Sequence, residues 1–139
     1  LLIHDIVEID AGDHPYHEPG HDWDAIAVKE RAAAERIFGL APAPQDAQLR
    51  ALWDEFEAAE TPDARFAKAL DRLQPILLNL QVGGGTWDDY AVSLEMVLER
   101  CRPTVEAASP RLWAEAEARI RAHFAGRAGG AARAAGRIA

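Results

Sequence analysis

The residues best suited to chemistry stand at the start of the chain, where His4, Asp5 and Glu8 fall within about one turn of an expected helix. Glu8 follows His4 by four positions and Asp5 by three, so all three side chains reach toward one side of that helix. An imidazole with carboxylates suits Mn, Fe, Co, Zn or Ni better than Ca. The alternative is a His–Asp hydrogen bond at a helix surface, because the dipeptide is common by chance.

The elements that must position these residues are helices. Ala, Leu, Glu and Arg dominate the chain, and the alternating patterns of strands are nearly absent. Turn and cap residues divide the chain into about six helices, and we predict an all-α bundle with no significant sheet. The expected helices cover residues 1–9, 24–38, 46–60, 62–82, 86–100 and 110–124.

Particular residues set the expected helix ends. Gly12 is expected to stop the first helix, and Thr61 and Ser109 each precede a proline that starts a helix. Pro75 should kink its helix or end and restart it, and Pro103 should stop the helix that begins at Thr86.

The apolar residues within 1–9 predict a largely buried first helix, in which a His–Asp pair needs partners. On the fourth helix, Phe66, Leu70, Leu73 and Leu77 predict one apolar face. Asp71 borders that face, where a lone carboxylate would be costly unless it is paired. It would be a metal ligand or the partner of a nearby base such as Arg72.

Composition limits the classes of function. The 139 residues carry 23 acidic and 15 basic side chains, a net charge of −8, which argues against a general nucleic-acid binder. One cysteine, Cys101, excludes an internal disulfide and fits the cytoplasm. No apolar run reaches the ~20 residues of a membrane helix, so we expect no membrane partner.

The chain starts at Leu1 and its single methionine is Met96, so we expect sequence upstream to be missing. We expect one folded domain over 1–124. Residues 125–139, rich in Ala, Gly and Arg, should form a disordered tail.

The stretch from His4 to Asp13 resembles the core motif of HD-domain metal-dependent phosphohydrolases, and most of all their 5'-deoxynucleotidase-like branch. There the His–Asp pair is followed by a Glu and then by Gly–Asp, here Glu8 and Gly12–Asp13. A later Phe-x-Lys-x-x-Asp pattern is matched by the segment that ends at Asp71. The resemblance covers roughly residues 1–120.

This resemblance implies an HD-domain-like helical bundle in which His4, Asp5 and Asp71 hold one divalent transition metal. A further His ligand belongs upstream of His4, so the first helices of the domain are expected to be absent. The metal would hold a phosphate oxygen and acidify a water. Glu8 and Asp13 are then the candidate catalytic residues.

Lys29 and Arg72 are candidate phosphate contacts, and both are equally plausible as salt-bridge partners. The function expected is hydrolysis of the phosphomonoester of nucleoside 5'-monophosphates, by a cytoplasmic homodimer whose partner is a small phosphorylated substrate. Two alternatives stay open. One is a truncated, inactive helical module for dimerisation, and the other is a sensor that binds a nucleotide without cleaving it.

Overall fold

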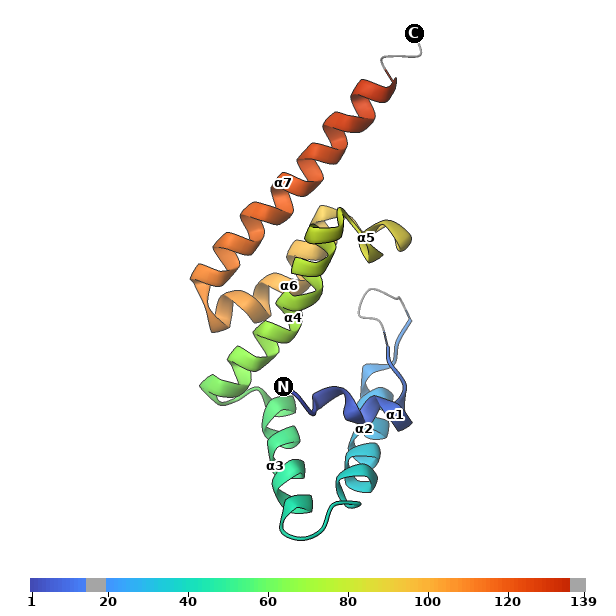
Figure 1. The fold of residues 1–139 in the computed structure, drawn as a ribbon, viewed down its shortest axis with the longest axis vertical. Coiled ribbons are helices and arrows are strands. Elements are labelled where there is room, and N and C mark those ends of the chain that lie inside the picture. Colours follow the sequence, from blue (N-terminus) through green and yellow to red (C-terminus); the bar gives the residue numbers. More distant parts are fainter. Residues whose placement is uncertain (15–19, 136–139) are drawn as a thin grey trace. The chain divides into compact units, whose positions relative to one another are not determined.

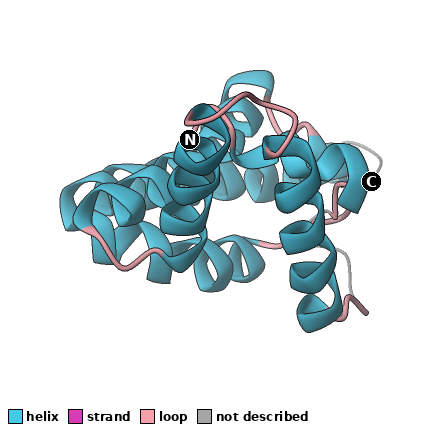
Figure 2. Ribbon diagram, turned by 90° about the horizontal axis from the view of Figure 1, so that it is seen from below, coloured by secondary structure: helices cyan, strands magenta, loops and turns pink. Residues whose placement is uncertain are grey.

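The structure is a computed structural model that describes residues 1–14 and 20–135. Over these ranges it contains helices and loops and no strand (Figure 2), which confirms the all-α prediction. The elements in chain order are η1 His4–Val7, a 3₁₀ turn, followed by α1 Glu8–Ala11, α2 Trp23–Phe38, α3 Gln45–Ala58, α4 Pro62–Val82, α5 Thr86–Asp89, α6 Leu94–Ala108 and α7 Pro110–Ala135.

Several helices begin or end at the cap and glycine residues expected from the sequence. The Thr61 hydroxyl accepts a hydrogen bond from the Ala64 amide at the start of α4, and Ser109 caps α7 through the Leu112 amide. Gly12 ends α1 at a φ of 87°, a conformation in which a β-carbon would be strained. These signals act over three or four residues, which is why the sequence alone revealed them.

One expectation about proline is wrong, because α6 does not stop at Pro103 but continues to Ala108. Helix α4 continues through Pro75 to Val82, so Pro75 does not end it. The expected helix from Thr86 is instead the single turn α5, and α6 starts after Ser93, whose hydroxyl accepts from the Met96 amide. Packing of the surrounding helix face outweighs the one backbone hydrogen bond that a proline removes.

The chain forms two compact units, 1–67 and 68–139. In the first unit, η1 and α1 lie against α2, and α2 lies against α3 (Figure 1). Their buried side chains form one core, made of Val7, Ala11, Ala33, Ala34, Phe38 and Trp53. This core anchors the short helices that carry the His–Asp motif.

The second unit packs around α6 and α7, which lie side by side (Figure 1). Its core draws on four helices and holds Ala69, Leu73 and Ile76 of α4, Trp87 of α5, Val97, Cys101 and Val105 of α6, and Trp113, Ala116 and Ile120 of α7. Helix α7 therefore turns Trp113, Ala116 and Ile120 into this core.

Two expectations about burial are wrong, one for residues 1–9 and one for the predicted apolar face of α4. Within residues 1–9 only Val7 is buried, whereas Leu2 is 99% and Ile9 76% exposed. On α4, Leu73 is buried but Phe66 and Leu77 are about half exposed. The helix turns Ala69 and Ile76 inward instead, because helical periodicity defines faces without saying which face meets a neighbour.

Helix α7 extends to Ala135 and so includes residues 125–135 of the segment predicted as a tail. Alanine and arginine are strong helix formers, and their number compensates for the glycines. The remaining tail residues, 136–139, lie outside the described residues. No helix among the described residues is both long and apolar enough to cross a membrane.

Candidate metal centre

The His4 imidazole is held by its own chain. Its Nδ1 lies 2.5 Å from the carbonyl oxygen of Leu1, one turn earlier. A carbonyl oxygen only accepts, so Nδ1 is the protonated nitrogen and donates this hydrogen bond. In the neutral ring this leaves the lone pair on Nε2, the arrangement found in metal-ligating histidines whose other nitrogen is bonded to the backbone.

His4 and Asp5 direct their donor atoms at each other. Nε2 of His4 lies 2.8 Å from Oδ1 of Asp5. The His4 side chain is 16% exposed and that of Asp5 is 64% exposed, so the pair faces water on the carboxylate side. The Phe56 ring, with its centroid 4.7 Å from that of His4, packs against the imidazole. Either a proton or a cation can be shared between these two atoms.

Glu8 stands in a surplus of negative charge. The pKa of its carboxyl is raised from 4.5 to about 7, mainly by burial and then by the negative charges of Asp5 and Asp13. Glu30 on α2 adds to the effect, while His4 opposes it. The unfavourable charge on Glu8 would be relieved by a cation among these carboxylates, which is consistent with the expected metal.

The structure places the other expected residues as follows. Asp13 is exposed in the loop after α1, and Lys29 is exposed on α2. Asp71 and Arg72 lie half-buried on α4, in the second unit. Within the described part of the chain, no three His, Cys, Asp or Glu side chains gather closely enough to hold a metal ion. The His4–Asp5 pair therefore offers a metal ion two converging donor atoms. Two donors make up only part of a coordination sphere.

The sequence holds a second His–Asp pair, His21–Asp22, in the loop before α2, and Asp22 has a structural role there. Asp22 is the N-cap of α2, where its carboxylate accepts from the Ala25 amide at 3.0 Å. His14 and His21 have ring centroids 5.3 Å apart. His17, the remaining histidine of this loop, lies outside the described residues.

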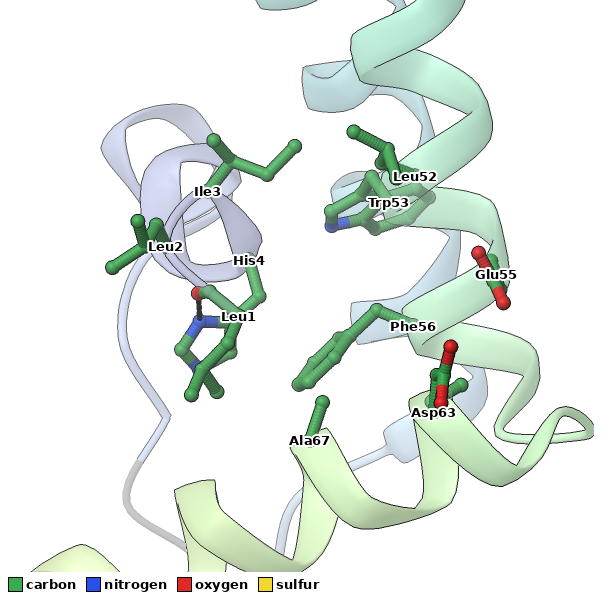
Figure 3. A pocket seen from close by; sticks show the side chains of 11 residues that line it. Leu1, Leu2, Ile3, His4, Leu52, Trp53, Glu55, Phe56, Asp63 and Ala67 are labelled. Carbon is green, nitrogen blue, oxygen red and sulfur yellow. Dashed lines mark hydrogen bonds between the residues drawn. The ribbon is translucent and has the colours of Figure 1, made fainter.

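Sequence reasoning missed three features of the first unit. Arg36 of α2 donates two hydrogen bonds to the carboxylate of Asp10, which ties α1 to α2. Phe56 contacts the His4 ring, as described above. A pocket of about 440 Å³ opens beside His4, between the N-terminal residues and α3 (Figure 3).

Comparison with known proteins identifies the fold. A model of the HD domain matches residues 1–113. The chain belongs to the HD domain family. This confirms the resemblance drawn from the segment His4–Asp13, and it agrees with the all-helical architecture.

Two relatives place the chain within the family. A crystal structure of a "predicted metal-dependent phosphohydrolase" from Magnetospirillum magnetotacticum MS-1 is 51% identical and superposes with a TM-score of 0.77, covering 88% of this chain and 61% of that one. A protein of Xenopus laevis named 5'-deoxynucleotidase HDDC2 is 34% identical over 85 residues, which are 58% of this chain and 39% of the relative. The HD chain thus spans less than two thirds of either relative.

Proposed function

We propose that this HD-domain chain takes part in a divalent-metal-dependent phosphohydrolase reaction that releases phosphate from nucleoside 5'-monophosphates, as in a 5'-deoxynucleotidase. The observation that carries the proposal is the convergence of His4 Nε2 and Asp5 Oδ1 at 2.8 Å, with the Leu1 carbonyl fixing the tautomer. The names of the two relatives support it, one as a metal-dependent phosphohydrolase and one as a 5'-deoxynucleotidase.

In this proposal His4, Asp5 and Asp71 are ligands of one divalent ion, chosen from Mn, Co, Fe, Zn and Ni. When bound, such an ion supplies Lewis-acid stabilisation of phosphate charge and lowers the pKa of a water. The Leu1 carbonyl keeps the imidazole in the tautomer that leaves Nε2 available.

The remaining roles concern protons and the phosphate. Glu8 orients the attacking water and takes up its proton, and Asp13 delivers a proton to the leaving 5'-oxygen. Lys29 and Arg72 contact the phosphate, Lys29 as a point charge and Arg72 as a bidentate fork. These positive groups offset the repulsion that a net charge of −8 exerts on a phosphorylated substrate.

The proposal is tested by phosphate release from a panel of deoxynucleoside 5'-monophosphates, with each candidate metal and with a chelator. We expect release that the chelator abolishes and that Asp71→Ala lowers by about 100-fold or more. Asp89→Ala, at an exposed position of α5, is the matched control and keeps the activity. Activity that survives Asp71→Ala contradicts the proposed ligand set.

A second candidate is a helical module that binds a nucleotide or a second copy without hydrolysis. It is favoured by the finding that the described residues gather no group of three possible ligands. It predicts nucleotide binding with no phosphate release at any added metal, so the same assay separates the two candidates. The expected cytoplasmic location and the homodimer remain predictions, the second testable by sedimentation.

A further inference from the structure

The polar contacts of the His4 imidazole described above are both local in the chain. Nδ1 donates to the carbonyl oxygen of Leu1, three residues earlier, and Nε2 lies beside the carboxylate of Asp5, the next residue. These contacts orient the ring relative to η1, which is a 3₁₀ turn of only four residues. A turn this short is marginally stable by itself. The place of the imidazole in the unit therefore depends on contacts from outside the turn.

Phe56 supplies such a contact from α3, a helix of 14 residues. Its ring centroid lies 4.7 Å from that of His4, and the two ring planes are tilted by 58°. Figure 3 shows the Phe56 ring reaching from α3 toward the chain start, where the imidazole lies. This distance and tilt are among the arrangements that aromatic pairs prefer. The contact joins the short turn to a long helix that is distant in the sequence.

Phe56 is buried, with 5% of the residue exposed, yet it lies outside the core of the first unit. Trp53, one turn earlier on α3, does belong to that core, together with Val7 of η1. Helix α3 therefore holds η1 in two ways. Trp53 and Val7 share the core that anchors the turn, and Phe56 packs against the His4 ring that the turn carries.

The aromatic character of Phe56 suits this contact. An imidazole rotates about two side-chain bonds, and a rigid ring packed beside it restricts both rotations. A proton or a metal ion on Nε2 gives the His4 ring positive character, which the π-system of a neighbouring phenyl ring attracts. A leucine would fill a similar volume, but it is more flexible and has no π-system.

We propose that Phe56 is a positioning residue of the candidate metal centre. Its ring holds the His4 imidazole in the orientation that keeps Nε2 beside the Asp5 carboxylate, so that both donor atoms are in place before an ion arrives. Donors that are already ordered bind an ion more tightly, because binding then restricts fewer side-chain rotations. The effect on metal affinity rests on the proposed function, whereas the restraint of the His4 ring does not.

The restraint of the ring is measured without any metal. With a chelator present, NMR relaxation of the ring C–H bonds of His4 reports how far the imidazole is immobilised. We expect an ordered ring in the wild type and a loss of that order in Phe56→Leu, a change that nearly conserves volume. Phe56→Tyr should restore the order, because the aromatic ring is kept and the adjoining pocket leaves room for the hydroxyl.

The consequence for the metal is measured by calorimetric titration with Co²⁺ alone, which requires no phosphate release. We expect Phe56→Leu to weaken Co²⁺ binding about tenfold, as for other residues that orient a metal ligand, and Phe56→Tyr to bind Co²⁺ like the wild type. Phe38→Leu is the matched control, since Phe38 is a phenylalanine of the same unit with 3% of its surface exposed. It should change neither the order of His4 nor the Co²⁺ affinity. Unfolding midpoints confirm that all three variants are folded.

The outcomes separate this role from the proposed function. If the wild type neither binds Co²⁺ nor releases phosphate, the proposed function is contradicted, and a loss of His4 order that is confined to Phe56→Leu still supports the restraint by Phe56. If the wild type binds Co²⁺ and Phe56→Leu binds it equally well, the positioning role is overturned and the metal centre stands. A His4 ring that stays ordered in Phe56→Leu overturns the role as well, and so does an equal loss of order in Phe38→Leu.

Discussion

At the scale of single residues, Glu8 shows how the fold changes the pKa of a side chain. Its pKa is raised from 4.5 to about 7, first by burial and then by neighbouring carboxylates. Because the folded-state pKa lies above the unfolded value, the associated stability is fully present below pH 4.5 and is lost as the pH rises through about 7. A divalent cation bound among these carboxylates would restore part of the stability that is lost as the pH rises.

The variant Glu8→Gln tests this reasoning. Glutamine cannot ionise, so we expect thermal unfolding midpoints equal to those of the wild type near pH 4 and higher by a few degrees at pH 8, measured with a chelator present. Glu115→Gln, at an exposed position of α7, is the control and should show no gain that grows with pH. If the advantage of Glu8→Gln is the same at both pH values, the raised pKa is wrong.

At the scale of elements, α1 is only four residues long and depends on its contacts for its place. One such contact is the ion pair in which Arg36 of α2 donates to Asp10 of α1. The hydrogen bond from Arg36 lowers the pKa of Asp10 below 3.8. The stability that this pair contributes is therefore present above pH 3.8 and is lost as the pH falls through the lowered value.

We expect Arg36→Gln to lower the urea midpoint slightly at pH 7, and the difference from the wild type to shrink as the pH falls below 3.8. The effect is small because water reaches both side chains, 56% of Arg36 and 32% of Asp10 being exposed. Arg119→Gln breaks an ion pair with Glu115 that lies within α7 alone, and it should cost less than the pair that joins two helices. Equal urea midpoints for Arg36→Gln and the wild type at pH 7 would show that the tie between α1 and α2 contributes nothing.

At the scale of the whole molecule, each unit has a core of its own. Ile120 of α7 is fully buried in the second core. Ile120→Ala should lower the free energy of unfolding by roughly 2–5 kcal/mol, because the removed methyl groups leave a cavity. Urea unfolding measures the loss, and amide hydrogen exchange reports whether α6 and α7 are the helices that lose protection.

Leu78→Ala is the control for this prediction. Leu78 lies on α4 with 51% of its surface exposed, so the same kind of truncation should cost less than about 1 kcal/mol. A comparable loss for both variants would mean that the second core is not packed as described.

The sequence by itself determined the helical class, most helix starts and the family. Caps such as Thr61 and Ser109 act on amides within their own turn, so they can be recognised without knowing the fold. The motif from His4 to Asp13 was equally readable, because its residues are close together in the chain. The fold confirmed these features with shifts of a few residues.

Only the tertiary structure decided which apolar faces are buried and what surrounds His4. Leu2 and Phe66 were expected inside and are exposed, because burial depends on which neighbours a helix meets. The Phe56 contact to the His4 ring joins residues 52 positions apart in the sequence, and the raised pKa of Glu8 depends in part on Glu30 of another helix. Periodicity describes one helix at a time, whereas desolvation and charge interactions are set by the atoms that folding brings within a few ångströms.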